Sequence, residues 1–141
     1  MIVLDSNVVS EFMLPGPDIR GIRWLDRQPA SSLWTTSVTI FEVRFGIETA
    51  SAGRRRTALT TAFENWLSQV VQQRILPYDE QAARVAASLA AERKRTGRTG
   101  ELRDTMIAGI VLASRATLAT RNVKHFDDIV KSVVNPWEPQ R

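Results

Sequence analysis

The first twelve residues, MIVLDSNVVSEF (residues 1–12), contain the pattern that decides the fold. Residues 2–4 are apolar and mostly β-branched, which predicts a short strand. The run stops at residues 5–7, Asp-Ser-Asn, which all favour the N-cap of a helix, and apolar residues then recur at helical spacing. The sequence therefore predicts a strand that leads directly into a helix, with Asp5 at the junction.

The same alternation of strand and helix continues along the chain. Further strands are predicted at residues 32–36, 74–77, 117–120 and 132–134. Helices are predicted at residues 18–27, from Ser37 or Thr39 onward, and at 57–71, 79–95 and 105–114, with a short helix or turn at 123–129. We therefore expect an α/β fold, in which helices flank a short parallel sheet and functional sites form at the carboxyl ends of the strands.

Length and composition restrict the class of protein. The 141 residues suffice for one core but not for two ordinary domains, so we expect one domain over residues 1–141. No apolar run approaches the roughly 20 residues of a membrane-spanning helix, and no basic or long apolar leader opens the chain, so the expected location is cytoplasmic. Because there is no cysteine and only one histidine, His125, any metal must be held by oxygen ligands.

Two features of the composition bear on nucleic-acid binding. Residues 53–103 hold ten Lys/Arg and five Asp/Glu, a net charge of +5, whereas the whole chain has +4. The basic runs at residues 54–56 and 93–95 predict either a surface for a polyanion or solvated helix ends. The four tryptophans are expected in the core or at a dimer interface rather than as platforms for base stacking: Trp24, Trp34, Trp66 and Trp137.

Three acidic residues lie near predicted junctions between elements. Asp5 ends the first strand, Glu42 lies near the start of the helix after the second strand, and Asp104 lies at the start of the 105–114 helix. We expect them to meet at one edge of the sheet. Clustered carboxylates repel one another unless a cation neutralises them, and oxygen ligands suit Mg²⁺ or Mn²⁺. A cation held there would support hydrolysis of a phosphodiester bond.

Each acid also has an ordinary structural interpretation. Asp5 and Asp104 can be helix caps, and Glu42 can be a surface acid in an early helical turn. The chain could then be a non-catalytic module that binds RNA or protein through its basic centre. A phosphoryl-accepting domain would use Asp5 as a nucleophile, but the second aspartate expected two residues later is missing. Phosphate-binding and dinucleotide-binding glycine motifs are missing from the sequence as well.

Several motifs occur in an order that resembles one known family. They are MIVLDSNVVSE (1–11), TSVTIFEVRFGI (36–47), DTMIAG (104–109), ATLATRN (116–122), Phe126 and NPW (135–137). Together they cover nearly the whole chain, and they resemble PIN-domain toxins of the VapC type, with the pattern of the FitB-like subgroup. Each motif is weak alone, but their order and spacing are specific.

The resemblance implies a PIN-like three-layer sandwich with a defined activity. It implies a Mg²⁺-dependent endoribonuclease that is the toxin of a type II toxin–antitoxin module, forms a homodimer and is inhibited by a cognate antitoxin protein. Asp5 and Asp104 match the main metal ligands of the family. Glu42 matches the acid that binds the metal directly or through water and helps to position the attacking water.

The chain departs from the family pattern at Asn122, where many members have a fourth acid. The carbonyl of Asn122 could still ligate a metal or orient a water, and the number of metal ions, one or two, stays open. Asp127 is a weaker candidate for the fourth acid. Ser6 and Thr120 are expected to hydrogen-bond the ligand carboxylates. The predicted catalytic set is Asp5, Glu42, Asp104 and Asn122.

Overall fold

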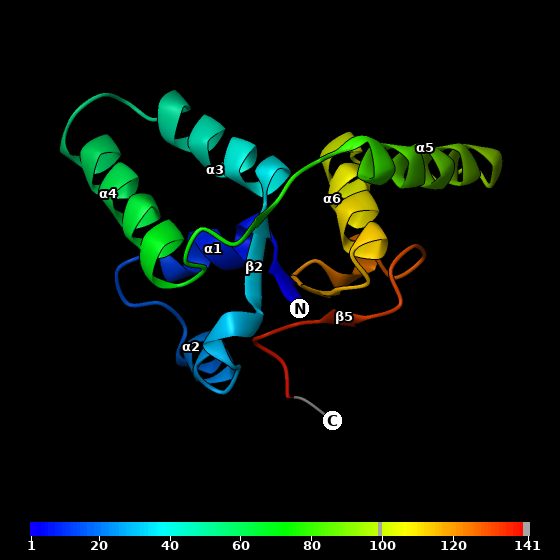
Figure 1. The fold of residues 1–141 in the computed structure, drawn as a ribbon. Coiled ribbons are helices and arrows are strands. Elements are labelled where there is room, and N and C mark those ends of the chain that lie inside the picture. Colours follow the sequence, from blue (N-terminus) through cyan, green and yellow to red (C-terminus); the bar gives the residue numbers. More distant parts are fainter. Residues whose placement is uncertain (99, 140–141) are drawn as a thin grey trace.

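A parallel sheet forms the centre of the structure, a computed structural model that describes residues 1–98 and 100–139 (Figure 1). In these residues its strands are β1 (Ile2–Leu4), β2 (Leu33–Thr36), β3 (Ile75–Leu76), β4 (Thr117–Ala119) and β5 (Val133–Val134). The strand order is β3-β2-β1-β4-β5, and every pairing is parallel. Because β1 has a neighbour on each side, Val3 and Leu4 are fully buried.

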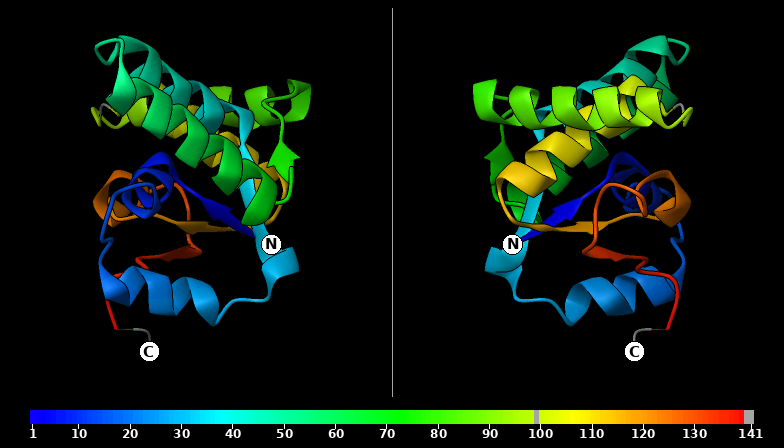
Figure 2. Two further views of the ribbon diagram at one scale, coloured as in Figure 1. Left: turned by 90° about the vertical axis from the view of Figure 1, so that its left-hand side faces the viewer. Right: turned by 90° about the vertical axis from the view of Figure 1, so that its right-hand side faces the viewer.

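Helices cover both faces of the sheet. They are α1 (Ser6–Phe12), α2 (Ile19–Asp26), α3 (Ser37–Thr49), α4 (Arg54–Gln69), α5 (Glu80–Arg95) and α6 (Leu102–Ala113), with short 3₁₀ turns η1 (Ala30–Ser32) and η2 (Val123–His125). Successive strand residues point to opposite faces, and Leu4 accordingly packs with α1 to α4, whereas Val3 packs mainly with α5 and α6. Figure 2 shows α2 on the far side of the strands from α5 and α6. The predicted three-layer α/β fold is confirmed.

Some predicted boundaries differ from the structure. The helix expected at residues 57–71 begins at Arg54, directly after Gly53. Gly53 has a φ of 132°, a backbone conformation that glycine adopts readily and most other residues do not. Helix α6 begins at Leu102, so Asp104 lies in its first turn rather than at its cap. The apolar pattern of the helix predicted at residues 18–27 places Ile19 inward, but Ile19 is exposed at the start of α2. The glycines and threonines of residues 96–100 predict a loop, and within it Thr99 lies outside the described residues.

The tryptophans belong to the core, as expected. Trp24, Trp66 and Trp137 are buried in the cluster around Leu4, and the partly buried Trp34 packs against the cluster around Val3. None of the helices found in residues 1–98 and 100–139 combines the length and the apolar character required to cross a bilayer.

Helices α5 and α6 pack closely against each other at Gly109. A Cβ atom added there would lie 2.6 Å from the carbonyl oxygen of Ala82 and 2.8 Å from the Cβ of Ala86. We expect Gly109→Ala to lower the free energy of unfolding by about 2 kcal/mol, because the backbone of α5 must move. Urea denaturation would measure the loss. Gly46→Ala in α3 is the matched control, since its Cβ would meet no atom within 4 Å, and an equal loss in both variants would contradict the argument.

Candidate active site

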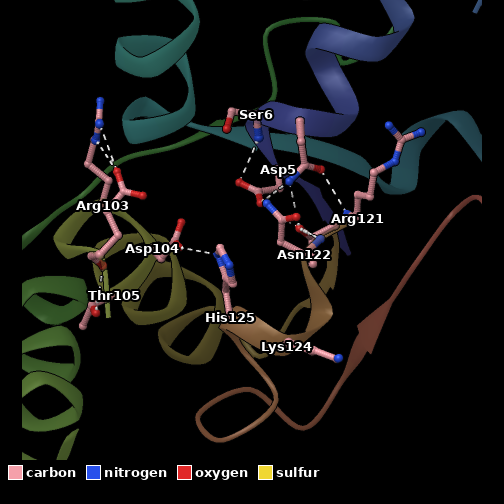
Figure 3. Close-up of polar contacts among 12 residues, drawn as sticks. Asp5, Ser6, Arg103, Asp104, Thr105, Arg121, Asn122, Lys124 and His125 are labelled. Atoms are coloured by element: carbon pink, nitrogen blue, oxygen red, sulfur yellow. Dashed lines mark hydrogen bonds and ion pairs between the residues drawn. The ribbon is translucent and has the colours of Figure 1, made fainter. Parts of the chain in front are cut away.

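An open cavity of about 270 Å³ lies beside the carboxyl ends of the central strands. Asp5 reaches it from the end of β1, Glu42 from α3, Asp104 from α6 and Asn122 from the segment after β4. Figure 3 shows Asp5, Asp104 and Asn122 around this cavity. The structure thus brings together all four residues that the sequence singled out, although they are far apart in the chain.

Asp5 is the most deeply buried of the acids, with 3% of its surface exposed. Its Oδ1 accepts a hydrogen bond from the backbone N–H of Ser6 at 2.8 Å. Its Oδ2 accepts from the hydroxyl of Thr120 at 2.8 Å and from the amide of Asn7 at 3.2 Å. Burial raises the pKa of the Asp5 carboxyl from 3.8 to about 6, although these hydrogen bonds act in the opposite direction. The carboxylate is therefore held rigidly in an environment that disfavours its charge.

Thr120 connects the two segments on either side of Asp5. Its hydroxyl oxygen accepts from the Asn7 amide and from the backbone N–H of Asn122, both at 3.1 Å. The Oδ1 of Asn7 accepts from the backbone N–H of Arg121 at 3.0 Å. Asn7 was not among the predicted site residues, although its position two residues after Asp5 placed it at the same strand-to-helix junction. These contacts tie the start of α1 to the segment that carries Asn122.

Glu42 has an unusual environment for a carboxylate. Its side chain is 17% exposed, and Oε1 is buried without a hydrogen-bond partner in the described part of the chain. Oε2 lies 4.0 Å from Nε of Arg103, which pairs more closely with Glu101 at 2.9 Å. Burial, reinforced by the charge of Asp5, raises the pKa of Glu42 to about 7. One carboxylate oxygen of Glu42 thus lacks a partner among residues 1–98 and 100–139.

Asp104 is paired with the single histidine of the chain. Its side chain is 13% exposed, and Oδ2 lies 3.2 Å from Nδ1 of His125. Burial raises the pKa of Asp104, and the nearby carboxylate of Glu101 raises it further. The sequence analysis used His125 only to exclude a multi-histidine metal site. A turn was predicted at residues 123–129, but its packing against α6, which places His125 beside Asp104, depends on contacts that no local pattern predicts.

The donor set of the cavity fits a hard cation. Asp5, Glu42 and Asp104 all have raised pKa values because they are desolvated, and the free oxygen of Glu42 is an unused ligand atom. In the described part of the chain, no three acidic, histidine or cysteine side chains already form a ready-made metal site. Asp127, the weaker candidate for a fourth acid, pairs with Arg98 at 3.1 Å and does not line the cavity.

Comparison with known proteins places the chain in a family. The PIN domain matches residues 2–131. The chain is 36% identical over 139 residues to the VapC ribonuclease Y4jK of Sinorhizobium fredii, covering 99% of both chains. It is 31% identical over 137 residues to the toxin FitB of Neisseria gonorrhoeae, covering 97% of this chain and 99% of that relative.

A solved structure shows the same relationship in three dimensions. The structure of FitAB bound to an IR36 DNA fragment matches with a TM-score of 0.88 and 31% identity, over 100% of this chain and 99% of that chain. Both sequence and fold therefore agree with the resemblance seen in the motifs. This chain belongs to the PIN-domain family, and its relatives include a VapC ribonuclease and the toxin FitB.

Proposed function

We propose that this protein is an endoribonuclease that depends on Mg²⁺, for which Mn²⁺ can substitute. The observation that carries the proposal is the unpartnered, buried oxygen of Glu42 in a cavity shared with Asp5 and Asp104. Three desolvated carboxylates in one cavity repel one another, and a bound cation removes that cost. The VapC relative from Sinorhizobium fredii is named a ribonuclease, which supports RNA as the substrate class.

The side chains suggest a division of roles. Asp5, Asp104 and the free oxygen of Glu42 would hold the cation, which supplies an activated water and charge stabilisation at the leaving oxygen. Three hydrogen bonds prevent Asp5 from turning away from the cavity. In the metal-free protein burial raises the pKa of Glu42 to about 7; a bound cation would lower it and keep Glu42 ionised, so that its second oxygen would position the attacking water. The Asn122 carbonyl would orient a water or serve as a further neutral ligand.

We further propose that the protein acts as a toxin in the cytoplasm, is held inactive by an antitoxin protein and forms a homodimer. The support is the relationship to the toxin FitB and to a VapC ribonuclease, and the match to the FitAB structure. The side chains of Phe41 and Phe45 on α3 stack with their ring centroids 6.0 Å apart, although they are 57% and 53% exposed. Such an exposed apolar surface is typical of a protein interface.

Cleavage of single-stranded RNA by the purified protein tests the ribonuclease proposal. We expect cleavage in Mg²⁺ or Mn²⁺, complete loss of cleavage when EDTA removes the cation, and recovery when Mg²⁺ is added in excess. Gel analysis of end-labelled RNA would detect internal cuts. Salt-sensitive RNA binding that is indifferent to Mg²⁺ and gives no cleavage would contradict the proposal and favour a non-catalytic binding module.

A further inference from the structure

Arg93, in the last turn of α5, is a buried charged residue that none of the roles described so far explains. Only 5% of its surface is exposed. The basic run at residues 93–95 was expected either to face a polyanion or to be a solvated helix end, and both interpretations are wrong for Arg93. The neighbouring Arg95 does follow the second interpretation, since its ion pair with Glu92 is open to solvent on both sides.

The guanidinium of Arg93 contacts the turn that follows β4. It forms two hydrogen bonds with the carboxylate of Asp128, from Nη2 at 2.9 Å and from Nε at 3.1 Å. Nη2 also donates to the backbone carbonyl of His125 at 2.6 Å. The planar fork of arginine can satisfy these acceptors at once, whereas a lysine ammonium cannot reproduce the paired geometry.

The same guanidinium also contacts the start of α6. Nη1 lies 3.5 Å from the hydroxyl of Thr105, which in turn donates to the carbonyl of Glu101 at 3.3 Å. The backbone at Gly100 passes so close that an added Cβ would lie 1.9 Å from Nη1. A side chain at residue 100 would therefore displace the guanidinium of Arg93.

The two segments that Arg93 joins are those that face each other across the cavity. The start of α6 carries Asp104, next to Thr105, and the turn after β4 carries Asn122 and His125 (Figure 3). At the cavity, the described residues of these two segments meet in the hydrogen bond between Asp104 and the exposed ring of His125. Arg98, just before α6, also binds this turn at the carbonyl of Lys124 and at Asp127, but its side chain is 46% exposed, whereas that of Arg93 is buried.

We propose that Arg93 is a positioning residue that holds the start of α6 and the turn after β4 at the separation the active site requires. Arg93 does not line the cavity that contains Asp5 and Glu42, and it acts through Thr105 on one side and through His125 and Asp128 on the other. The consequence for catalysis rests on the proposed ribonuclease function. The mechanical coupling of the two segments does not, and it can be measured without RNA or metal.

Hydrogen exchange of the metal-free protein tests the coupling. We expect Arg93→Lys, which retains the charge but loses the fork, to increase exchange rates at least about tenfold in both 101–105 and 123–128, with little change in β1 or α4. Asp128→Asn, which retains one acceptor, should give a smaller increase in the same two segments. Arg95→Lys is the matched control from the same helical turn, and its rates should equal those of the parent protein.

Binding of Mn²⁺, followed by electron paramagnetic resonance, tests the consequence for the site. Loss of a residue that orients ligand-bearing segments typically weakens metal binding by about 10- to 100-fold, and we expect a loss in that range for Arg93→Lys and none for Arg95→Lys. Faster exchange in only one segment, or uniformly through the chain, would overturn the proposal. The proposal would also be overturned if the parent protein binds Mn²⁺ and Arg93→Lys binds it with the same affinity.

The variants keep the two proposals separable. If Arg93→Lys fails to fold, Asp128→Asn decides the outcome by the same two readouts. A parent protein that neither binds Mn²⁺ nor cleaves RNA would refute the ribonuclease function, whereas the exchange experiment would still support or refute the role of Arg93 in coupling the two segments.

Discussion

Asp104→Asn is expected to reduce RNA cleavage at least about 1000-fold while leaving the fold intact. Charge stabilisation by a bound cation contributes several kcal/mol to the transition state, and the loss of about 4 kcal/mol corresponds to roughly 1000-fold in rate. Asparagine has nearly the same size as aspartate, and Asp104 lies at the cavity rather than in an apolar cluster, so packing should be retained. Asp5→Asn should have a similar effect on the rate.

Single-turnover cleavage of RNA, with circular dichroism as the test of folding, would measure the loss. Asp127→Asn is the matched control, because Asp127 is an exposed acid outside the cavity, and its rate should stay close to that of the parent protein. If the protein is a toxin, Asp104→Asn should also abolish growth arrest when the chain is expressed alone. Cleavage by Asp104→Asn within tenfold of the parent rate would exclude Asp104 as a main metal ligand.

The stability of the metal-free protein is expected to fall as the pH rises from about 4.5 to about 7.5. The pKa of Asp5 is raised from 3.8 to about 6 in the folded protein, so the unfolded chain releases this proton at lower pH than the folded one. At a pH above the pKa of Asp5 in the folded protein, ionisation of Asp5 lowers the free energy of unfolding by about 3 kcal/mol. About 2 kcal/mol of this loss develops between pH 4.5 and pH 7.5. The raised pKa values of Glu42 and Asp104 act in the same direction.

Urea denaturation in EDTA at several pH values would measure this fall. Asp5→Asn should reduce the slope, because it removes the carboxyl that titrates. Asp18→Asn is the control. Hydrogen bonds from Arg20 lower the pKa of Asp18 to about 2, so the contribution of Asp18 to stability changes only at a pH below this range. Added Mg²⁺ should stabilise the parent protein most at the high end of the range. Equal slopes in the parent protein and Asp5→Asn would refute the role given to Asp5.

Local patterns determined much of the fold. The apolar run of β1 followed by the cap residues Asp5 and Ser6 predicts a strand, a junction and a helix from interactions within a few residues, and the structure has all three. The repeated alternation of such units also predicts the parallel sheet and the edge at which acids from different elements gather. The residues at which helices begin and end were predicted less accurately. The start of α6 at Leu102 instead of Thr105 was missed because Glu101, its N-cap residue, makes no side-chain capping bond.

The composition of the site depended on contacts between distant segments. The sequence by itself determined the strand-and-helix order and placed Asp5, Glu42, Asp104 and Asn122 as candidates, because these follow from short-range periodicity and from family motifs. Only the tertiary structure decided that a buried oxygen of Glu42 has no partner among the residues described, that His125 faces Asp104 and that Arg93 is buried rather than solvated. The physical reason is that burial and pairing are set by what packs against a side chain, and for Arg93 those groups lie up to 35 residues away in the chain.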